Sequence, residues 1–167
     1  MKPRRLITVW LAGGLLVLGL ALPLAGQLCA FSGSPPGDLG QHDGLLKPPS
    51  ETENSVSSQA ALHPGHPMQQ GAMIDALALC GTPAEAMARL SDLLRTLPGA
   101  TLVTQRDDYL YAQFRSRALG FVDDVEFWAD PVAGVIQLRS ASRLGGKDFG
   151  VNRARIEAIR ARLLAGP

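Results

Sequence analysis

Apolar and polar residues alternate in four short segments between residues 100 and 143, which is the pattern of half-buried β-strands. Turn-forming residues separate these segments. The intervening stretches are too short for a crossover connection, so neighbouring strands must run antiparallel. We therefore predict a four-stranded antiparallel meander with strands at Ala100–Gln105, Tyr109–Arg117, Val122–Ala129 and Gly134–Arg143.

A helix is predicted on each side of this meander. Thr82, Pro83 and Glu85 have the order of a capping box with proline in the first turn, and apolar residues follow at helical spacing as far as Leu97. A second helical period runs from about Val151 to Leu164. Its apolar side is formed by Ile156, Ile159 and Leu163, and its charged side by Arg153, Glu157 and Arg160, with Arg153 and Glu157 expected as an ion pair.

The fold class predicted for residues 71–167 is α+β, with the antiparallel meander packed against the two helices. Two other zones precede this domain. Residues 1–30 combine a basic start with an uncharged apolar stretch, Leu6–Gly26, which fits either a cleaved signal peptide or a transmembrane anchor. Residues 31–70 are rich in Gly, Pro and Ser without apolar periodicity, which predicts a flexible linker.

The basic residues before Leu6–Gly26 should stay in the cytoplasm, which places the domain on the periplasmic or extracytoplasmic side, either anchored in the inner membrane or secreted. The net charge of +1 gives no electrostatic case for nucleic acid as a partner. Cys29 and Cys80 form no disulfide framework, and Cys80 is expected to be a small buried side chain unless it bridges to Cys29. His63 and His66 are expected to be solvated loop residues, so neither a metal nor a cofactor is predicted.

Side-chain alternation predicts that each strand has one apolar and one polar face. The apolar faces, with Leu110, Phe114 and Phe127 among them, should pack beneath the helices, and Asp123 should point to that side and meet a buried arginine or cap a loop. Tyr109, Tyr111 and Trp128 lie among the charges of the other face. The charged residues predicted for this polar face are Arg115, Arg117, Asp124, Glu126, Arg139 and Arg143.

The turn lengths suggest a register for the polar face. One row would contain Arg115, Asp124 and Arg139 side by side, because directly opposite residues interact most strongly. The next rows would be Gln113, Glu126 and Gln137, and then Tyr111 with Trp128.

Two interpretations of the polar face remain open. It is either a solvated sheet surface with weak ion pairs, or a covered or concave surface whose arginines bind an anion. The aromatic residues among the charges favour the second interpretation. A further candidate anion site is the glycine-rich loop Gly145–Gly150 with Asp148, Asn152 and Arg153 at the start of the last helix, although such a loop is also typical of a plain turn closed by Asp148.

The stretch "RSRALGFVDDVEFWADPVAGVIQLRSASRLGGKDFGVNRARIEAIR", from Arg115 to Arg160, closely resembles domain-of-unknown-function family 1499. The resemblance implies a domain of bacterial or plastid envelopes behind an N-terminal membrane or export segment, and it implies no established activity. Upstream, "LKPPSETENSVSSQA" resembles the family motif in which two cysteines flank a Ser-Pro-Asn turn. Pro49 and Ser55 occupy those cysteine positions here, so a disulfide or metal role of the pair is absent. The resemblance also implies, within the predicted linker, an ordered strip near Asn54 to Gln59 that docks on the domain.

Three functional hypotheses follow. The first is a non-catalytic binding or assembly module of the cell envelope, with an envelope protein or an anionic small molecule as partner and the membrane reached through the N-terminal segment. The second is a hydrolase-like enzyme with Asp124 or Glu126 as base and Arg139 as anion stabiliser, because no histidine follows His66 to complete a serine triad. The third is a purely structural charge network that fixes the register of the sheet.

Overall fold

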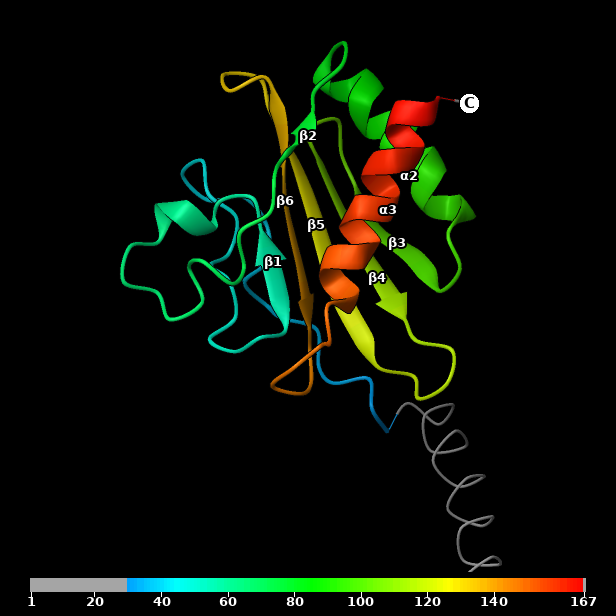
Figure 1. Ribbon diagram of the computed structural model, residues 1–167. Helices are drawn as coiled ribbons and strands as arrows, with labels where there is room; N and C mark the ends of the chain where they lie inside the picture. The colour runs from blue at the N-terminus through cyan, green and yellow to red at the C-terminus, as the bar shows by residue number, and fades with distance from the viewer. Residues whose placement is uncertain (1–29, 167) are drawn as a thin grey trace, which may run out of the picture.

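The computed structural model of the protein describes residues 30–166 as an α+β fold, which confirms the predicted fold class (Figure 1). The elements in chain order are β1 (Ser55–Ser57), the 3-10 helix η1 (Ala60–Leu62), β2 (Leu77–Ala78), α2 (Pro83–Thr96), β3 (Ala100–Gln105), β4 (Tyr109–Arg115), β5 (Val122–Asp130), β6 (Val135–Ser142) and α3 (Val151–Ala165). The predicted apolar segment Leu6–Gly26 and Cys29 lie outside the described residues. Among residues 30–166, no helix combines the length and the apolar character needed to cross a bilayer.

One antiparallel sheet holds the fold together, in the order β1-β6-β5-β4-β3, with β2 paired to the other end of β6. The predicted meander forms its larger part. The sheet gains two strands beyond that prediction, because β6 is long enough to pair with β5 on one side and with both β1 and β2 on the other. Strand β1 contains Ser55–Ser57, so the strip predicted to dock near Asn54 to Gln59 does pair with the domain.

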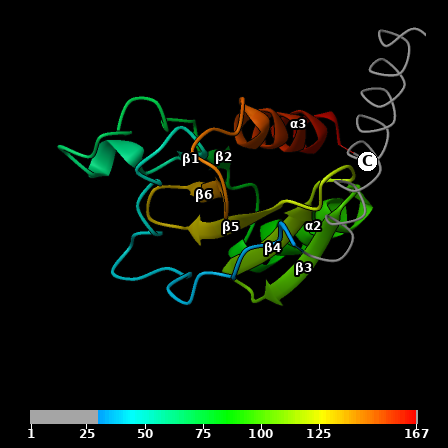
Figure 2. The same ribbon diagram turned by 90° about the horizontal axis from the view of Figure 1, so that it is seen from below.

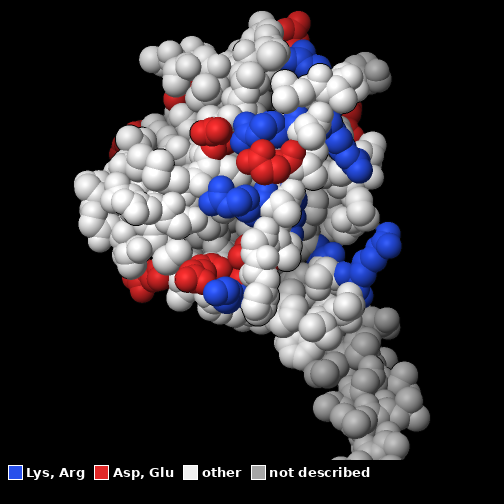
Figure 3. Space-filling model, in the orientation of Figure 1, with Lys and Arg blue, Asp and Glu red and all other residues white. Residues whose placement is uncertain are grey.

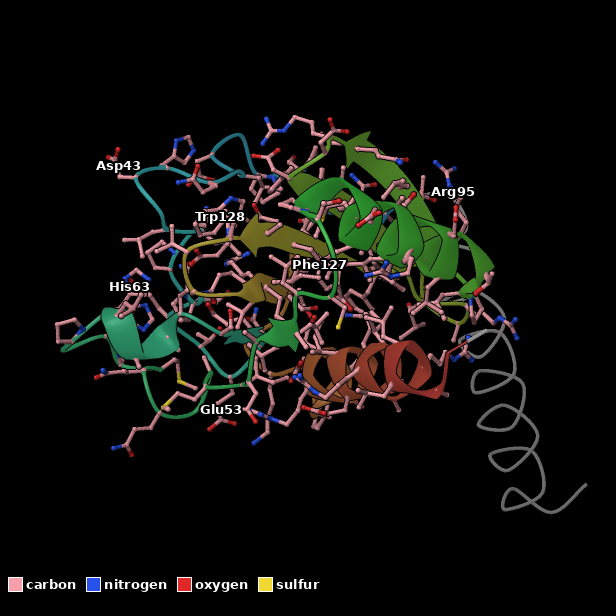
Figure 4. All side chains as sticks on the ribbon, turned by 90° about the horizontal axis from the view of Figure 1, so that it is seen from above. Asp43, Glu53, His63, Arg95, Phe127 and Trp128 are labelled. Carbon is pink, nitrogen blue, oxygen red and sulfur yellow. The ribbon has the colours of Figure 1, made fainter. Side chains whose placement is uncertain are left out.

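The two helices cover one face of the sheet, as Figures 1 and 2 show for α3. Phe127, Leu138 and Ile159 are fully buried in the core between the sheet and the helices. Figure 4 shows Phe127 on the helix side of β5 and Trp128, the next residue, on the opposite side. Alternation along β5 therefore separates a hydrophobic face from a polar face, as the sequence predicted.

Both predicted helices are present. The capping box of α2 is complete, since Thr82 Oγ1 accepts a hydrogen bond from Glu85 N and the Glu85 carboxylate accepts one from Thr82 N. The predicted ion pair between Arg153 and Glu157 is wrong. Glu157 instead pairs with Arg160 at 3.0 Å, because the Arg153 guanidinium donates to the carbonyls of residues 71 and 73.

The predicted register of the polar face is wrong by two residues in both hairpins. Asp124 lies opposite Gln113 and Ala141, not opposite Arg115 and Arg139. On the β4–β5 side, β4 ends at Arg115, before the predicted end at Arg117. The hydrogen bond from Ser116 N to the Phe121 carbonyl closes a longer loop than predicted.

On the β5–β6 side, Asp130 stays in the strand and its side chain accepts hydrogen bonds from the amides of Val132 and Ala133. The rows are in fact Tyr109–Trp128–Gln137 and Tyr111–Glu126–Arg139. A shift of two residues keeps every side chain on its predicted face.

Residues 31–70 are not a free spacer in the structure. Residues 32–50, which we call the covering segment, lie across the polar face of the sheet, on the side opposite α3 (Figure 2). Leu46 is buried there to 2% exposure. Cys80 also differs from its prediction, because it is exposed in the connection between β2 and α2.

Candidate functional site

The polar face of the sheet is covered, so its interpretation as a solvated surface is wrong. Glu126 is 0% exposed, Asp124 1% and Arg139 4%. Arg115 emerges on the same side, since its guanidinium and that of Arg143 both contact Ser32 of the covering segment. Removing these charges from water is costly unless each is paired or hydrogen-bonded, so their partners define what the site can do.

Asp124 and Arg143 form a closed pair. Arg143 Nε and Nη2 donate to the two carboxylate oxygens of Asp124 at 2.8 and 2.7 Å, a bidentate arrangement. The Tyr111 hydroxyl also donates to Asp124 and accepts from Arg143 Nη2 at 3.2 Å. The bond to Asp124 raises the pKa of Arg143, and burial raises the pKa of the Tyr111 hydroxyl. The charges of Asp124 and Arg143 thus neutralise each other within the fold.

Glu126 links the sheet to the covering segment. Its Oε1 accepts a hydrogen bond from Gly40 N at 2.7 Å and another from the Tyr109 hydroxyl at 2.8 Å. Its Oε2 is buried without a hydrogen-bond partner among the described residues. Burial raises the pKa of the Glu126 carboxyl above its usual range, and the bonds from Gly40 and Tyr109 only partly oppose this.

Arg139 is the remaining charge of the face. Its Nε donates to the Pro48 carbonyl at 2.9 Å, and its Nη1 lies 4.0 Å from Glu126 Oε2, beyond hydrogen-bond range. No other hydrogen bond from this guanidinium to the described residues is present. Burial lowers the pKa of Arg139, against the opposing effect of the carboxylates of Glu126 and Asp124. Arg139 therefore keeps donor groups that the fold does not use.

Apolar contacts fix the covering segment beside these charges. Leu46 packs with Tyr109 and Tyr111 in a small second core, to which Trp128 is also adjacent. The Gln59 side chain accepts from Leu46 N at 2.8 Å and donates to the carbonyl of residue 44 at 2.8 Å. The strip after β1 thus holds the covering segment in place from the side.

An open cleft of about 620 Å³ lies between the covering segment and the sheet. Asp124, Arg139 and Arg143 line it from the sheet, and Lys47 and Asp38, which pair at 2.6 Å, line it from the covering segment. Glu126 does not line the cleft. The cleft is of a size that admits a small ligand.

The structure places the nine predicted site residues in three groups. Four come together beneath the covering segment: Asp124, Glu126, Arg139 and Arg143. Arg115 and Arg117 are exposed at the end of β4, outside the cleft. The last three, Asp148, Asn152 and Arg153, lie on the helix side at the start of α3.

The loop before α3 is a turn closed by Asp148, one of the two interpretations of the sequence. Asp148 accepts hydrogen bonds from Gly150 N and Asn152 N, both at 2.9 Å, and these bonds bring its pKa below the usual range although burial acts the other way. Asn152 is fully buried and bonds to Ser140, so it serves the fold. Asp123 points to the same side and pairs with Arg155, as predicted.

Sequence reasoning missed the contributions of the covering segment. Gly40 and Pro48 act through backbone groups, and nothing in their identity signals this. Leu46 acts through its backbone amide and through its buried side chain. The only signal was Leu45-Leu46, an apolar pair within a polar stretch. Within residues 30–166, no three His, Cys, Asp or Glu side chains converge in a way that could hold a metal ion.

The raised pKa of Glu126 gives a pH-dependent contribution to stability. The folded protein binds this proton more tightly than the unfolded chain, so the contribution is fully present below the ordinary carboxyl pKa and is lost as the pH rises through the folded pKa. We expect the free energy of unfolding of the wild type, relative to Glu126→Gln, to fall as the pH rises from about 4 towards 7. Urea denaturation across this range measures it. A flat profile for Glu126→Gln would contradict the assignment.

The fold and the site define a class: an α+β domain whose charged sheet face is closed by the chain that precedes it. Residues 45–163 match the family described as "Protein of unknown function (DUF1499)", and the chain belongs to this family. No curated protein and no solved structure matches the chain. The matched range includes Pro49 and Ser55, where Ser55 Oγ accepts a hydrogen bond from Ser50 N at 2.8 Å and so links the two sides of that turn.

Proposed function

We propose that this chain is a non-catalytic binding module of the cell envelope, and that its cleft takes up an anionic group through Arg139. The observation that carries the proposal is a nearly buried guanidinium that lines an open cleft while only its Nε is hydrogen-bonded within the described residues. The Nη atoms of Arg139 are not enclosed within the fold, so their donors are available to a ligand in the cleft.

The chemistry of the cleft favours a carboxylate or a phosphate group. A guanidinium offers parallel donors that match two oxygens of such a group. Arg143 is neutralised by Asp124, and Lys47 is paired with Asp38, so Arg139 is the cation that remains.

The hydrolase alternative has less support from this geometry. A general base must reach the substrate, yet Glu126 is buried away from the cleft and Asp124 is held at both oxygens by Arg143. The envelope location rests on the basic start and on the apolar stretch Leu6–Gly26, which direct the domain out of the cytoplasm.

Anion titration of the full-length chain in detergent tests the proposal, with inorganic phosphate and acetate as probes and calorimetry as the readout. We expect binding to the wild type and at least about a tenfold weaker affinity for Arg139→Lys, which keeps the charge but loses the planar fork. Arg95→Lys, at an exposed position of α2, is the matched control and should bind as the wild type does. Equal affinity of Arg139→Lys and wild type, with both folded by circular dichroism, would contradict the proposal, as would no binding of either anion.

The source of the anionic group is a separate question with its own experiment. Wild type and Arg139→Lys are each used to capture partners from the native membrane fraction. A protein recovered with the wild type alone identifies an acidic segment of an envelope protein, whereas a small molecule recovered by mass spectrometry identifies a free ligand.

A further inference from the structure

The end of the domain where the described chain begins gathers three segments, which we call the proximal end: residues 31–33, the β4–β5 loop 116–121 and the β6–α3 loop 143–150. The Phe31 and Phe121 rings stack with centroids 5.4 Å apart. Ser32 accepts hydrogen bonds from Arg115 and Arg143. Figure 1 shows these segments together at the lower end of the molecule, whereas the β3–β4 and β5–β6 turns lie at the opposite, distal end.

Only a few residues separate the proximal end from the apolar stretch that precedes it. The uncharged stretch ends at Gly26, five residues before Phe31. Five residues span at most about 18 Å even when fully extended. If Leu6–Gly26 sits in a bilayer, Phe31 and its neighbours must therefore lie close to the bilayer surface.

The proximal end exposes large apolar side chains. Phe149 is 87% exposed, Leu144 41% and Phe121 36%. Phe149 also has a φ of 54°, which is rare for a large side chain. The hydrogen bonds that the Asp148 side chain accepts from Gly150 N and Asn152 N hold the turn in that form. The fold thus presents an aromatic ring to its surroundings at a conformational cost, without using the ring in its own core.

The two ends of the domain also differ in charge. Arg117, Lys147 and Asp148 lie at the proximal end, and Arg115 lies beside it at the end of β4. Lys147 is paired to Glu53 at 2.7 Å. The distal turns carry three aspartates and one arginine: Arg106, Asp107, Asp108 and Asp130. In Figure 3, Lys or Arg side chains project at the lower right of the molecule. A basic end with exposed aromatic and aliphatic groups complements an anionic lipid surface.

We propose that the proximal end rests on an anionic lipid bilayer, with Phe149, Leu144 and Phe121 at the level of the headgroups and Arg117 and Arg115 against the phosphates. This orientation turns the distal end away from the membrane. It depends on the apolar stretch being embedded in the bilayer, and it is independent of whether the cleft binds an anion.

Site-specific tryptophan quenching tests this orientation in the full-length chain. The chain is reconstituted into phosphatidylglycerol vesicles with brominated acyl chains, in a background where Trp10 is replaced by phenylalanine and Trp128 is retained. Phe149→Trp reports on the proximal end, and Val132→Trp, at a residue 97% exposed in the β5–β6 turn, is the matched distal control. We expect brominated lipid to reduce the emission added at position 149 by about twofold or more and to leave that at position 132 unchanged.

A second proximal reporter, Leu144→Trp, guards against a local defect at position 149, and circular dichroism checks that each variant is folded. Quenching at 149 and 144 that does not exceed quenching at 132 would overturn the proposal. Brominated phosphatidylcholine vesicles test the charge requirement, and weaker quenching there is expected. Equal quenching in both lipids would overturn the role of Arg115 and Arg117.

Discussion

Replacing Leu46 by alanine should lower the free energy of unfolding by about 2–5 kcal/mol, the range for a fully buried leucine. Leu46 is 2% exposed and packs against Tyr109 and Tyr111, so its removal leaves a cavity between the covering segment and the sheet. A leucine in a spacer that does not contact the domain would cost nothing to replace. Urea denaturation followed by circular dichroism measures the difference.

Leu62→Ala is the matched control for this prediction. Leu62 comes from the same part of the chain but is 59% exposed in η1, so its replacement should change the free energy of unfolding by less than about 0.5 kcal/mol. If the two variants are equally stable, the covering segment does not pack as described.

Asp124→Ala should be at least as damaging, with a loss of about 3–5 kcal/mol, because it leaves the guanidinium of Arg143 buried without its carboxylate. The two side chains are only 2% and 5% exposed and are joined by two hydrogen bonds. The loss comes mainly from the unpaired charge, so the double variant Asp124→Ala with Arg143→Met should recover much of it. Chemical denaturation of Asp124→Ala, Arg143→Met and the double variant gives the coupling free energy between the two side chains.

The pair of Glu157 and Arg160 on α3 provides the comparison for that cycle. Glu157 is half exposed, so Glu157→Ala should cost no more than about 1 kcal/mol. A loss for Asp124→Ala as small as that for Glu157→Ala would mean that the pair of Asp124 and Arg143 is not shielded from water as described.

The sequence predicted the four central strands and both helices because their periods are regular and their ends carry clear turn and cap residues. Alternation alone placed Asp124, Glu126 and Arg139 on one face, since the side-chain period of a strand is two. The register could not be obtained in the same way. It depended on hydrogen bonds of Ser116 and Asp130 that decide where a strand stops, and these shift the pairing without changing the pattern.

The covering segment was interpreted as a linker because its composition has few apolar residues and many glycines and prolines. Such a segment cannot fold alone, but it can order on a surface that satisfies its backbone. Glu126 accepts the amide of Gly40, Arg139 donates to the carbonyl of Pro48, and Gln59 serves both Gly44 and Leu46. The partners of these charges are main-chain groups, which every residue has, so the sequence carries no distinctive mark of the contact.

Only one of the two walls of the candidate cleft could therefore be predicted from the sequence. The wall that the sheet provides, with Asp124, Arg139 and Arg143, follows from alternation, whereas the wall from the covering segment, with Asp38 and Lys47, does not. Asp148, Asn152 and Arg153 were candidates because of a glycine-rich loop before a helix. The structure shows that this loop turns on Asp148 and lies on the opposite side of the sheet.

Amide hydrogen exchange of Gly40 and Leu46 tests most directly that the covering segment closes the charged face. Gly40 N donates a hydrogen bond to Glu126 and Leu46 N donates one to Gln59. Asp43 is exposed (Figure 4), its amide N–H makes no hydrogen bond to the described residues, and it serves as the reference. We expect the amides of Gly40 and Leu46 to exchange at least about a hundredfold more slowly than that of Asp43 after correction for intrinsic rates. Exchange of all three at the rate of an unfolded chain would contradict a closed face.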